Sequence, residues 1–470
     1  MDNRKQGIHL MSTPTSTTQL DFSSIDWSPH SFEDPGGRLF WKDGRVFRAL
    51  RGDSAAAFCR LEDAGLLEEM PKWNIVKTWR SDAQIEGYDL VVEHEALPPS
   101  PLVSEWSPRM LRDAALLFLE ISTKLAAHGL QLQDSHGWNM MFAGAQVRYI
   151  DFSSIIPLSA GENWKPLNEF LNCFLHPLQL IHRQAADYAF FLLGRDNWVP
   201  VEATIPRLNS LQFEWMRKRR QREYAKLMAI NEQGGPPAAI RLAEMLRNQI
   251  QKCPIPRPQT RWSHYAGSFP EPGTQPQPDW NEKQQSVAKI LKSLDGGTLL
   301  DVGCNTGWYS VLAAQLDLSV VSMDTDRTCI DDLYRHAKQH DLAITPVVGS
   351  FFSPAIAHGP RFYDPLEKRF QADHTLMLAL AHHLFFKQGY EVSSIVEIAA
   401  AVTRKTLVLE YVPGNDYWIE QWNVPHRQSD YAMDVWKREL NRFFPNIESY
   451  PSERSHESSD VQRTILVATR

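Results

Sequence analysis

The stretch LLDVGCNTG at residues 299–307 decides the fold of the C-terminal part of this chain. Apolar residues typical of a buried strand lead directly into a turn with glycines at 303 and 307, and helix-forming sequence follows. Gly303 allows a sharp bend and a close approach of a ligand to the backbone, and Gly307 lets the next helix start near the strand. The spacing G-x-N-x-G differs from the dinucleotide pattern G-x-G-x-x-G. We interpret this segment as a nucleotide-cofactor turn.

A second strand brings an acid to the same edge of the expected sheet. The apolar run at 319–323 ends in Asp324, about twenty residues after the glycine turn. A carboxylate at this place can accept hydrogen bonds from both hydroxyls of a ribose. Asp326 is an alternative for the same role.

Strand and helix patterns alternate along the C-terminal part. We expect strands at 298–302, 319–323, 344–348, 375–380 and 406–410, and helices at 281–294, 308–315, 328–338 and 393–401. This alternation predicts an α/β fold with a parallel sheet covered by helices on both faces. Ligands of such sheets bind at the carboxyl ends of the strands, where the glycine turn and Asp324 fall.

Two runs resemble the class I S-adenosylmethionine (SAM) methyltransferases, and in particular their nodulation-type branch. They are DVGCNTGWYS at 301–310 and LALAHHL at 378–384, and the resemblance covers the part of the chain from residue 280 onward. It implies a Rossmann-like sheet that binds SAM. The cofactor-binding residues it implies are Asp301, Gly303, Asn305, Gly307 and Asp324. The family often has a further acid near the adenine, yet VVGSFF at 347–352 offers only Ser350.

A histidine pair, His382 and His383, follows the fourth expected strand, next to where the reactive methyl group should lie. An imidazole with a pKa near 6.5 can accept a proton from an acceptor hydroxyl, so both are candidate catalytic residues. The alternative is that they pack as half-buried hydrogen-bonding residues. Tyr309 and Glu410 are further candidates. Methyl transfer itself mainly requires alignment of the nucleophile, the methyl carbon and the leaving sulfur.

A second constellation lies near the middle of the N-terminal part. The run HGLQLQDSHGWN at 128–139 and the run VRYIDF at 147–152 resemble the catalytic and metal-binding loops of protein kinases and small-molecule phosphotransferases. The resemblance implies that Asp134 is the base and that Asn139 and Asp151 bind Mg²⁺ beside ATP. The spacing suits this chemistry, because one carboxylate must meet the acceptor hydroxyl while an amide oxygen and a second carboxylate converge on the metal.

This constellation departs from the kinase pattern at three places. Leu132 stands where a histidine is usual, Ser153 replaces the glycine after Asp-Phe, and Arg48 stands where a strand lysine would contact the phosphates. Arginine and lysine are not interchangeable at such a site. Three interpretations stay open: an ordinary hairpin with turn aspartates, a degenerate kinase fold that binds without transferring, and a working phosphotransferase.

The chain of 470 residues is too long for one hydrophobic core. We expect a disordered lead-in at 1–25, an α+β kinase-like domain at 26–252, a linker at 253–279 and a methyltransferase domain at 280–470. Seven prolines between residues 254 and 278 mark the linker. Trp262 and Tyr265, near its middle, either fold over the cofactor or anchor the linker.

The composition of the chain limits the class of protein, its partners and the compartment in which we expect it. Hydrophobic residues make up 43% and charged residues 22%, as in ordinary globular proteins, and the net charge of −7 argues against a general polyanion binder. Five cysteines without a C-x-x-C pair suit a reducing compartment. No apolar run approaches membrane-spanning length. We expect a cytoplasmic bacterial protein without a transmembrane segment, and its oligomeric state is unknown.

The leading hypothesis is a SAM-dependent methyltransferase that modifies a small molecule or a glycan. A nucleic-acid methyltransferase is the first alternative. Adenine amino-methylating enzymes have an Asp/Asn-Pro-Pro-aromatic run where this chain has AHHL at 381–384, so nucleic acid is an unfavoured partner. The other alternative is a non-catalytic sensor in which both domains bind nucleotides.

Overall fold

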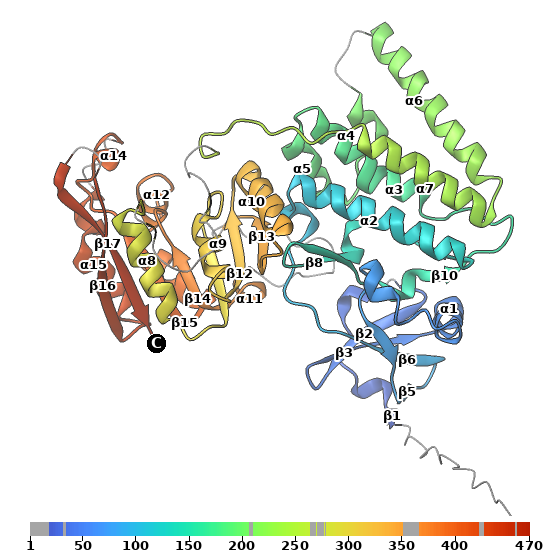
Figure 1. Cartoon of the computed structure of the whole chain (residues 1–470), viewed down its shortest axis with the longest axis horizontal. Coiled ribbons are helices and arrows are strands. Elements are labelled where there is room, and N and C mark those ends of the chain that lie inside the picture. The colour runs from blue at the N-terminus through green and yellow to red at the C-terminus, as the bar shows by residue number, and fades with distance from the viewer. Residues whose placement is uncertain are drawn as a thin grey trace, which may run out of the picture.

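The computed structural model describes residues 18–31, 34–205, 210–263, 269, 277, 279–350, 366–422, 427–455 and 458–470. The N-terminal and C-terminal halves lie next to each other, and helix α10 (Arg327–Gln339) stands at their junction (Figure 1). The sheets of these halves have the α+β and Rossmann-like fold classes that the sequence predicts.

A seven-stranded sheet forms the centre of the C-terminal half, in the spatial order β13-β12-β11-β14-β15-β17-β16. The first five strands run parallel, and β17 is antiparallel to both of its neighbours. The chain order reverses beside β11, and ligands of open α/β sheets bind at the carboxyl ends of the strands at such a switch point. The strands are β11 (Thr298–Val302), β12 (Ser319–Asp324), β13 (Ile344–Val348), β14 (Ala372–Met377), β15 (Thr403–Tyr411), β16 (Asn446–Ser455) and β17 (Ser458–Thr469).

Helices cover both faces of this sheet. Leu299 belongs to one apolar core with α8, α9 and α10, whereas Leu300 belongs to a second core with α12, α13 and α15. Neighbouring residues of one strand point to opposite faces, so both faces of β11 are buried, as expected for a parallel sheet. The helices are α8 (Glu282–Ser293), α9 (Trp308–Ala314), α11 (Leu366–Arg369), α12 (Ala381–Phe386), α13 (Val392–Val402), α14 (Tyr417–Glu420) and α15 (Met433–Leu440).

The N-terminal half begins with a four-stranded antiparallel sheet of order β2-β3-β6-β4. Asp43 and Gly44 join its first two strands with φ of 51° and 73°, the left-handed pair that a two-residue hairpin turn requires. The predicted hairpin is therefore present. The strands are β2 (Gly37–Lys42), β3 (Arg45–Leu50), β4 (Thr78–Arg80) and β6 (Leu90–His94).

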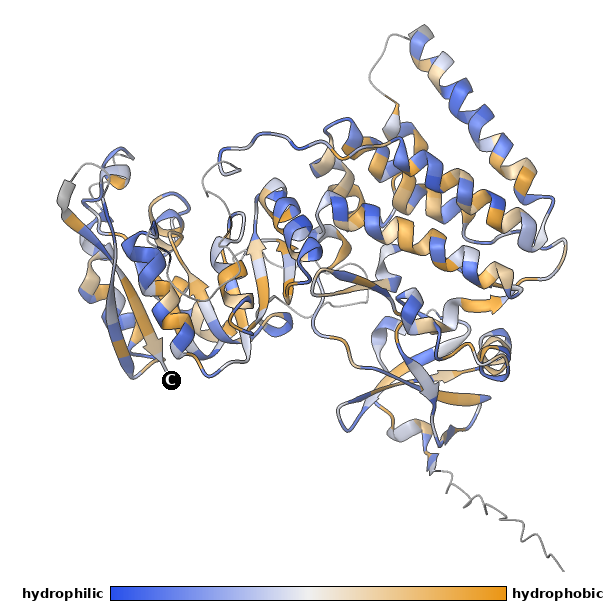
Figure 2. Ribbon diagram, viewed as in Figure 1, coloured by the Kyte–Doolittle hydropathy of each residue, from blue (hydrophilic) through white to orange (hydrophobic). Residues whose placement is uncertain are grey.

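A mainly helical region follows, and two small strand pairs carry the kinase-like loops. β7 (Leu130–Leu132) pairs with β10 (Ile155–Pro157), and β8 (Met140–Ala143) pairs with β9 (Gln146–Tyr149). Much of α6 is hydrophilic in Figure 2. Across the described residues, no helix combines the length and the apolarity needed to cross a bilayer. The helices are α1 (Gly52–Asp63), α2 (Pro108–Ala127), α3 (Leu167–Phe170), α4 (His176–His182), α5 (Ala186–Asp196), α6 (Ser210–Asn231) and α7 (Gly235–Gln251).

Polar contacts tie α10 to the segment that enters α2. Asp331 accepts hydrogen bonds from the Ser107 hydroxyl and from the backbone N–H of Arg109, both at 2.8 Å. The Arg327 guanidinium donates to the backbone carbonyl of Trp106, and it also lies over the ring of Phe190 at 4.0 Å. The N-terminal half therefore contacts the helix that directly follows β12.

Two parts of the fold differ from the expectations. Within the expected disordered lead-in, residues 1–17 lie outside the described residues. Residues Thr18–Leu20, by contrast, form strand β1, which pairs in parallel with β5 (Ala83–Ile85). The antiparallel pair β16 and β17 was not expected. β16 is an edge strand with Pro451 in its middle and several exposed positions, so its sequence lacks the apolar pattern of a strand.

Candidate functional site

The glycine turn has the backbone shape that its sequence predicts. Gly303, Asn305 and Gly307 have φ of 74°, 54° and 88°, all in the left-handed region. A Cβ atom added at Gly307 would come within 2.6 Å of the Leu333 side chain, and one at Gly303 would lie 3.3 Å from Leu380. Both glycines are therefore required by conformation and by close packing.

Asp324 lies directly against this turn. Its Oδ2 accepts a hydrogen bond from the backbone N–H of Asn305 at 2.8 Å, and its Oδ1 accepts from the N–H of Asp326 at 2.8 Å. A carboxylate offers about four lone-pair positions, so acceptor capacity remains for ribose hydroxyls. The alternative, Asp326, caps α10 instead, because its Oδ1 accepts from the N–H groups of Thr328 and Cys329.

Asp301 is the second carboxylate at the turn, and it is buried. It accepts a hydrogen bond from the Ser310 hydroxyl at 2.6 Å. Burial raises the pKa of Asp301 to about 7, and the nearby charge of Asp324 adds to the rise despite the Ser310 bond. Burial also raises the pKa of Asp324. Within the described residues no basic side chain forms an ion pair with either acid, so the pair suits a cationic ligand.

SAM is such a ligand, since it carries an ammonium and a sulfonium group. The open backbone of the glycine turn, the buried carboxylates and the remaining acceptor positions on Asp324 all fit it. Asn305 contributes through its backbone N–H, while its side chain donates to the carbonyl of Trp262 at 3.0 Å. Residues of the expected linker thus cross over the turn. Tyr265 lies outside the described residues.

The histidine pair lies near the glycine turn, because Trp262 contacts both His383 and Asn305. The ring of Trp262 stands edge-on to His383 at 5.7 Å, and Trp422 lies 5.0 Å from His383 on another side. Burial lowers the pKa of His383 to about 4 and that of His382 well below its usual value. Both imidazoles are therefore neutral at pH 7, and they are weaker proton acceptors than an exposed histidine.

Lys283 is a residue of this region that the sequence analysis missed. It lies on α8 with only 8% of its side chain exposed, and its Nζ is 2.6 Å from Glu410 Oε2. A lysine on an amphipathic helix normally faces water, so the sequence alone gives no sign that Lys283 is buried. Its role becomes visible only from its contact with a buried acid. Glu410, named from the sequence as a candidate, has a fully buried side chain at the end of β15.

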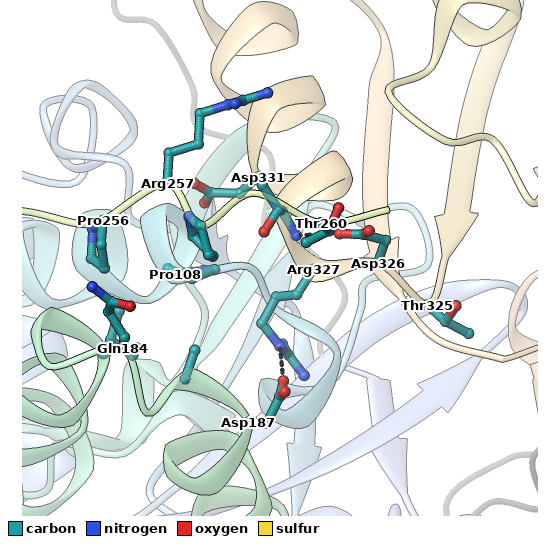
Figure 3. A pocket seen from close by; sticks show the side chains of 14 residues that line it. Pro108, Gln184, Asp187, Pro256, Arg257, Thr260, Thr325, Asp326, Arg327 and Asp331 are labelled. Carbon is teal, nitrogen blue, oxygen red and sulfur yellow. Dashed lines mark hydrogen bonds and ion pairs between the residues drawn. The ribbon is translucent and has the colours of Figure 1, made fainter. Parts of the chain in front are cut away.

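A cavity of about 380 Å³ lies between the two halves. Thr325 and Asp326 line it from one side, and Asp187 and Arg257 line it from the N-terminal half and the linker. Figure 3 shows Arg327 extending toward Asp187, at 3.6 Å. Since neither the glycines of the turn nor the histidines line this cavity, it is separate from the expected methyl-transfer point.

The kinase-like residues also come together. The Asn139 side-chain amide donates to Asp134 Oδ1 at 2.6 Å, and the Ser154 hydroxyl donates to the same oxygen at 2.9 Å. Burial, followed by the charge of Asp151, raises the pKa of Asp134 to about 6. Asp134, Asn139 and Asp151 therefore share one site, as their spacing predicts.

Arg48 occupies the metal side of this site. Its Nη1 forms ion pairs with Asp151 at 2.9 Å and with Asp34 at 2.8 Å, and it also contacts the Ser153 hydroxyl. A guanidinium bound to the expected metal-binding carboxylate competes with Mg²⁺ for that carboxylate. No group of three His, Cys, Asp or Glu side chains arranged for a metal occurs among the described residues. Binding of Mg²⁺ by Asn139 and Asp151 would therefore require Arg48 to leave Asp151.

Comparison with known proteins gives one similar curated protein. The chain is 25% identical over 439 residues to the nodulation protein NoeA of Rhizobium meliloti strain 1021, which covers 88% of this chain and 90% of that protein. The C-terminal half has the Rossmann-like architecture that the sequence predicts. Its strand order, its glycine turn and the likeness to a nodulation protein confirm the predicted resemblance and fold class. No protein-family model matches the chain.

Solved structures give weaker likenesses. The bifunctional kinase-methyltransferase WbdD is 18% identical with a TM-score of 0.30, over 39% of this chain and 39% of that chain. Magnesium protoporphyrin IX methyltransferase from Synechocystis PCC 6803, with bound SAH, is 16% identical with a TM-score of 0.28, over 40% of this chain and 82% of that chain. Such scores do not establish a common overall structure.

Proposed function

We propose that this protein transfers a methyl group from SAM to a small-molecule or glycan acceptor. The observation that carries the proposal is the hydrogen bond between the Asn305 N–H and Asp324 Oδ2, at 2.8 Å. This bond joins the glycine turn to the proposed ribose acid at the carboxyl ends of β11 and β12, beside the switch point of a parallel sheet.

In this proposal, each residue at the turn has a separate role. Asp324 accepts hydrogen bonds from the ribose hydroxyls, and Asp301 provides the negative charge that attracts the cofactor ammonium. Gly303 and Gly307 allow the left-handed bend and the close packing of Leu380 and Leu333, and Asn305 shapes the bend between them. SAM supplies the activated methyl group, while the protein aligns it with the acceptor and excludes water.

The proposed acceptor site lies at the carboxyl ends of β14 and β15, beside His382 and His383. The two imidazoles lie among aromatic rings, and His382 stacks on Trp422 with an interplanar angle of 5°. Neutral imidazoles and indole rings suit an uncharged acceptor such as a hydroxyl-bearing small molecule or a sugar. The net charge of −7 disfavours a nucleic-acid acceptor. We propose His383 as the closer candidate for a proton acceptor, because its ring adjoins Trp262 above the turn.

For the kinase-like part, we propose the degenerate alternative. Arg48 neutralises Asp34 and Asp151, so Mg²⁺ and ATP would have to displace two ion pairs that are mostly buried. The part then acts as a support for α10 and the loop after Asp324, through the contacts of Arg327 and Asp331 described above. A non-catalytic nucleotide sensor is the competing function.

Thermal-shift measurements on the full chain with SAM, with S-adenosylhomocysteine (SAH) and with Mg²⁺-ATP test these assignments together. We expect SAM and SAH to raise the Tm and Mg²⁺-ATP to leave it unchanged. Transfer of a labelled methyl group from SAM into a component of a cell extract would separate an enzyme from a sensor. If neither SAM nor SAH binds saturably, the proposed function is wrong.

A further inference from the structure

The segment between β14 and α12 contains an unusual backbone conformation. Ala379 has φ of 50°, in the left-handed region that residues with a Cβ rarely adopt. The residue lies between the end of a central strand and the helix that carries His382 and His383. Strained positions of this kind persist only where surrounding contacts hold them, and they concentrate at functional sites.

The contact that holds Ala379 comes from Glu410. Its Oε2 accepts the Ala379 backbone N–H at 2.8 Å and also pairs with Lys283 Nζ at 2.6 Å. The other oxygen, Oε1, accepts from the Ser452 hydroxyl at 2.6 Å. Residues of α8 and β16 therefore hold the Glu410 carboxylate of β15, and this carboxylate accepts the Ala379 N–H.

The charge state of this group is fixed. Burial alone would raise the pKa of Glu410, but the ion pair and hydrogen bond with Lys283 lower it below the usual value. The same pairing raises the pKa of Lys283 against the effect of burial. A buried ion pair adds little net stability compared with apolar residues of equal volume, so stability alone does not explain why this one is present.

The Ala379 turn also contacts the cofactor turn. Leu380 follows Ala379, and its Cδ2 lies 3.3 Å from the position of a Cβ on Gly303. α12 begins at the next residue. A change in the φ of Ala379 would therefore move Leu380 relative to Gly303 and turn the histidine pair relative to the cofactor.

We propose that Glu410, held by Lys283, is a positioning residue for methyl transfer: through the Ala379 N–H it fixes the turn that sets His382 and His383 against the glycine turn. This inference rests on the proposed function and deepens it. Glu410 acts on the backbone of the turn, and it need not touch the acceptor or the cofactor.

The test compares Glu410→Gln, the double variant Glu410→Gln with Ala379→Gly, and the control Asp416→Asn in the full chain. Glycine adopts the left-handed conformation without strain, so it should restore the turn once Glu410 no longer holds it. Asp416 is equally buried and pairs with Arg463, but no contact of it reaches Ala379 within the described residues.

We expect Glu410→Gln to lower the rate of labelled-methyl transfer by about tenfold or more relative to the native chain. In the double variant with Ala379→Gly, the rate should be within about threefold of the native rate. SAH affinity, measured by titration calorimetry, should change by less than about threefold in every variant. Asp416→Asn should reduce the Tm and leave transfer intact. Equal losses of transfer in Glu410→Gln and Asp416→Asn, or no recovery with glycine, would mean that Glu410 is only structural.

A second readout does not depend on the acceptor. NMR signals of the His382 and His383 rings should shift in Glu410→Gln and return toward the native positions in the double variant. Unmoved signals overturn the positioning role even if SAM binds, whereas absent SAH binding by the native chain overturns the proposed function instead. If Glu410→Gln does not fold, the double variant Lys283→Met with Glu410→Gln takes its place in each comparison, because it removes both charges of the buried pair.

Discussion

The two acid-bearing sites of this chain have opposite electrostatic character. At the glycine turn, Asp301 and Asp324 have no ion-pair partner among the described residues, and burial raises the pKa of both. In the kinase-like part, Asp34 and Asp151 share the guanidinium of Arg48. Lys283 is a positive charge near Asp301, but it forms its ion pair with Glu410, whereas Arg48 pairs directly with both acids of the second site. We therefore expect the acids at the glycine turn, and not those beside Arg48, to bind a cationic ligand.

The largest expected effect comes from blocking the glycine turn. In Gly303→Val, the side chain needs a left-handed φ and meets Leu380, which together cost roughly 3 kcal/mol, or about a hundredfold in SAH affinity. Gly389→Val is the matched control, because Gly389 has φ of 81° and open space around it. Calorimetry should show lost binding only in the first variant, and similar binding in both would remove the turn from the site.

Next in size is the loss of the ribose acid. Asp324→Asn should weaken SAH binding by about 1.5–3 kcal/mol, the range for hydrogen bonds to a charged group. Asp326→Asn keeps the helix cap, since asparagine caps as well as aspartate, and should leave the affinity unchanged. A larger loss of SAH affinity in Asp326→Asn than in Asp324→Asn would mean that Asp326 binds the ribose.

A smaller effect should appear in the pH dependence of binding. Below pH 7 the Asp301 carboxyl, with its pKa raised to about 7, gains a proton and loses the charge that attracts the cofactor ammonium. SAH affinity should therefore rise about tenfold from pH 6 to pH 8. The histidine pair stays neutral across this window, because burial lowers both pKa values. Asp301→Asn should flatten the profile, and a flat native profile contradicts this role.

The smallest expected effect belongs to the kinase-like part. Mg²⁺-ATP should leave the Tm of the native chain unchanged, because Arg48 already pairs with the expected metal ligand Asp151. A stabilising shift that disappears in Asp151→Asn would instead show a working nucleotide site, and the contrast between the two acid-bearing sites would then fail.

The sequence predicted the cofactor side of the site better than the acceptor side. Residues 299–307 and Asp324 follow local rules, namely strand period, turn conformation and position at a strand end, so β11 and β12 were placed within a residue. Lys283 and Ala379 obey no local rule. One is a buried lysine, the other an alanine with a left-handed φ, and both depend on Glu410 far along the chain.

The N-terminal half shows the same limit. Spacing placed Asp134, Asn139 and Asp151 together, and it identified arginine at position 48 as a departure. It could not show that this guanidinium reaches both Asp34 and Asp151, because that contact joins a loop, a strand and a turn that are distant in sequence.

A crystal structure of the full chain with SAH tests the central claim most directly. We predict the ribose hydroxyls within hydrogen-bond distance of Asp324, the amino-acid part in the bend at residues 303–307, and no nucleotide at Arg48. SAH bound away from Asp324, or a bend filled by its own side chains, would contradict the account.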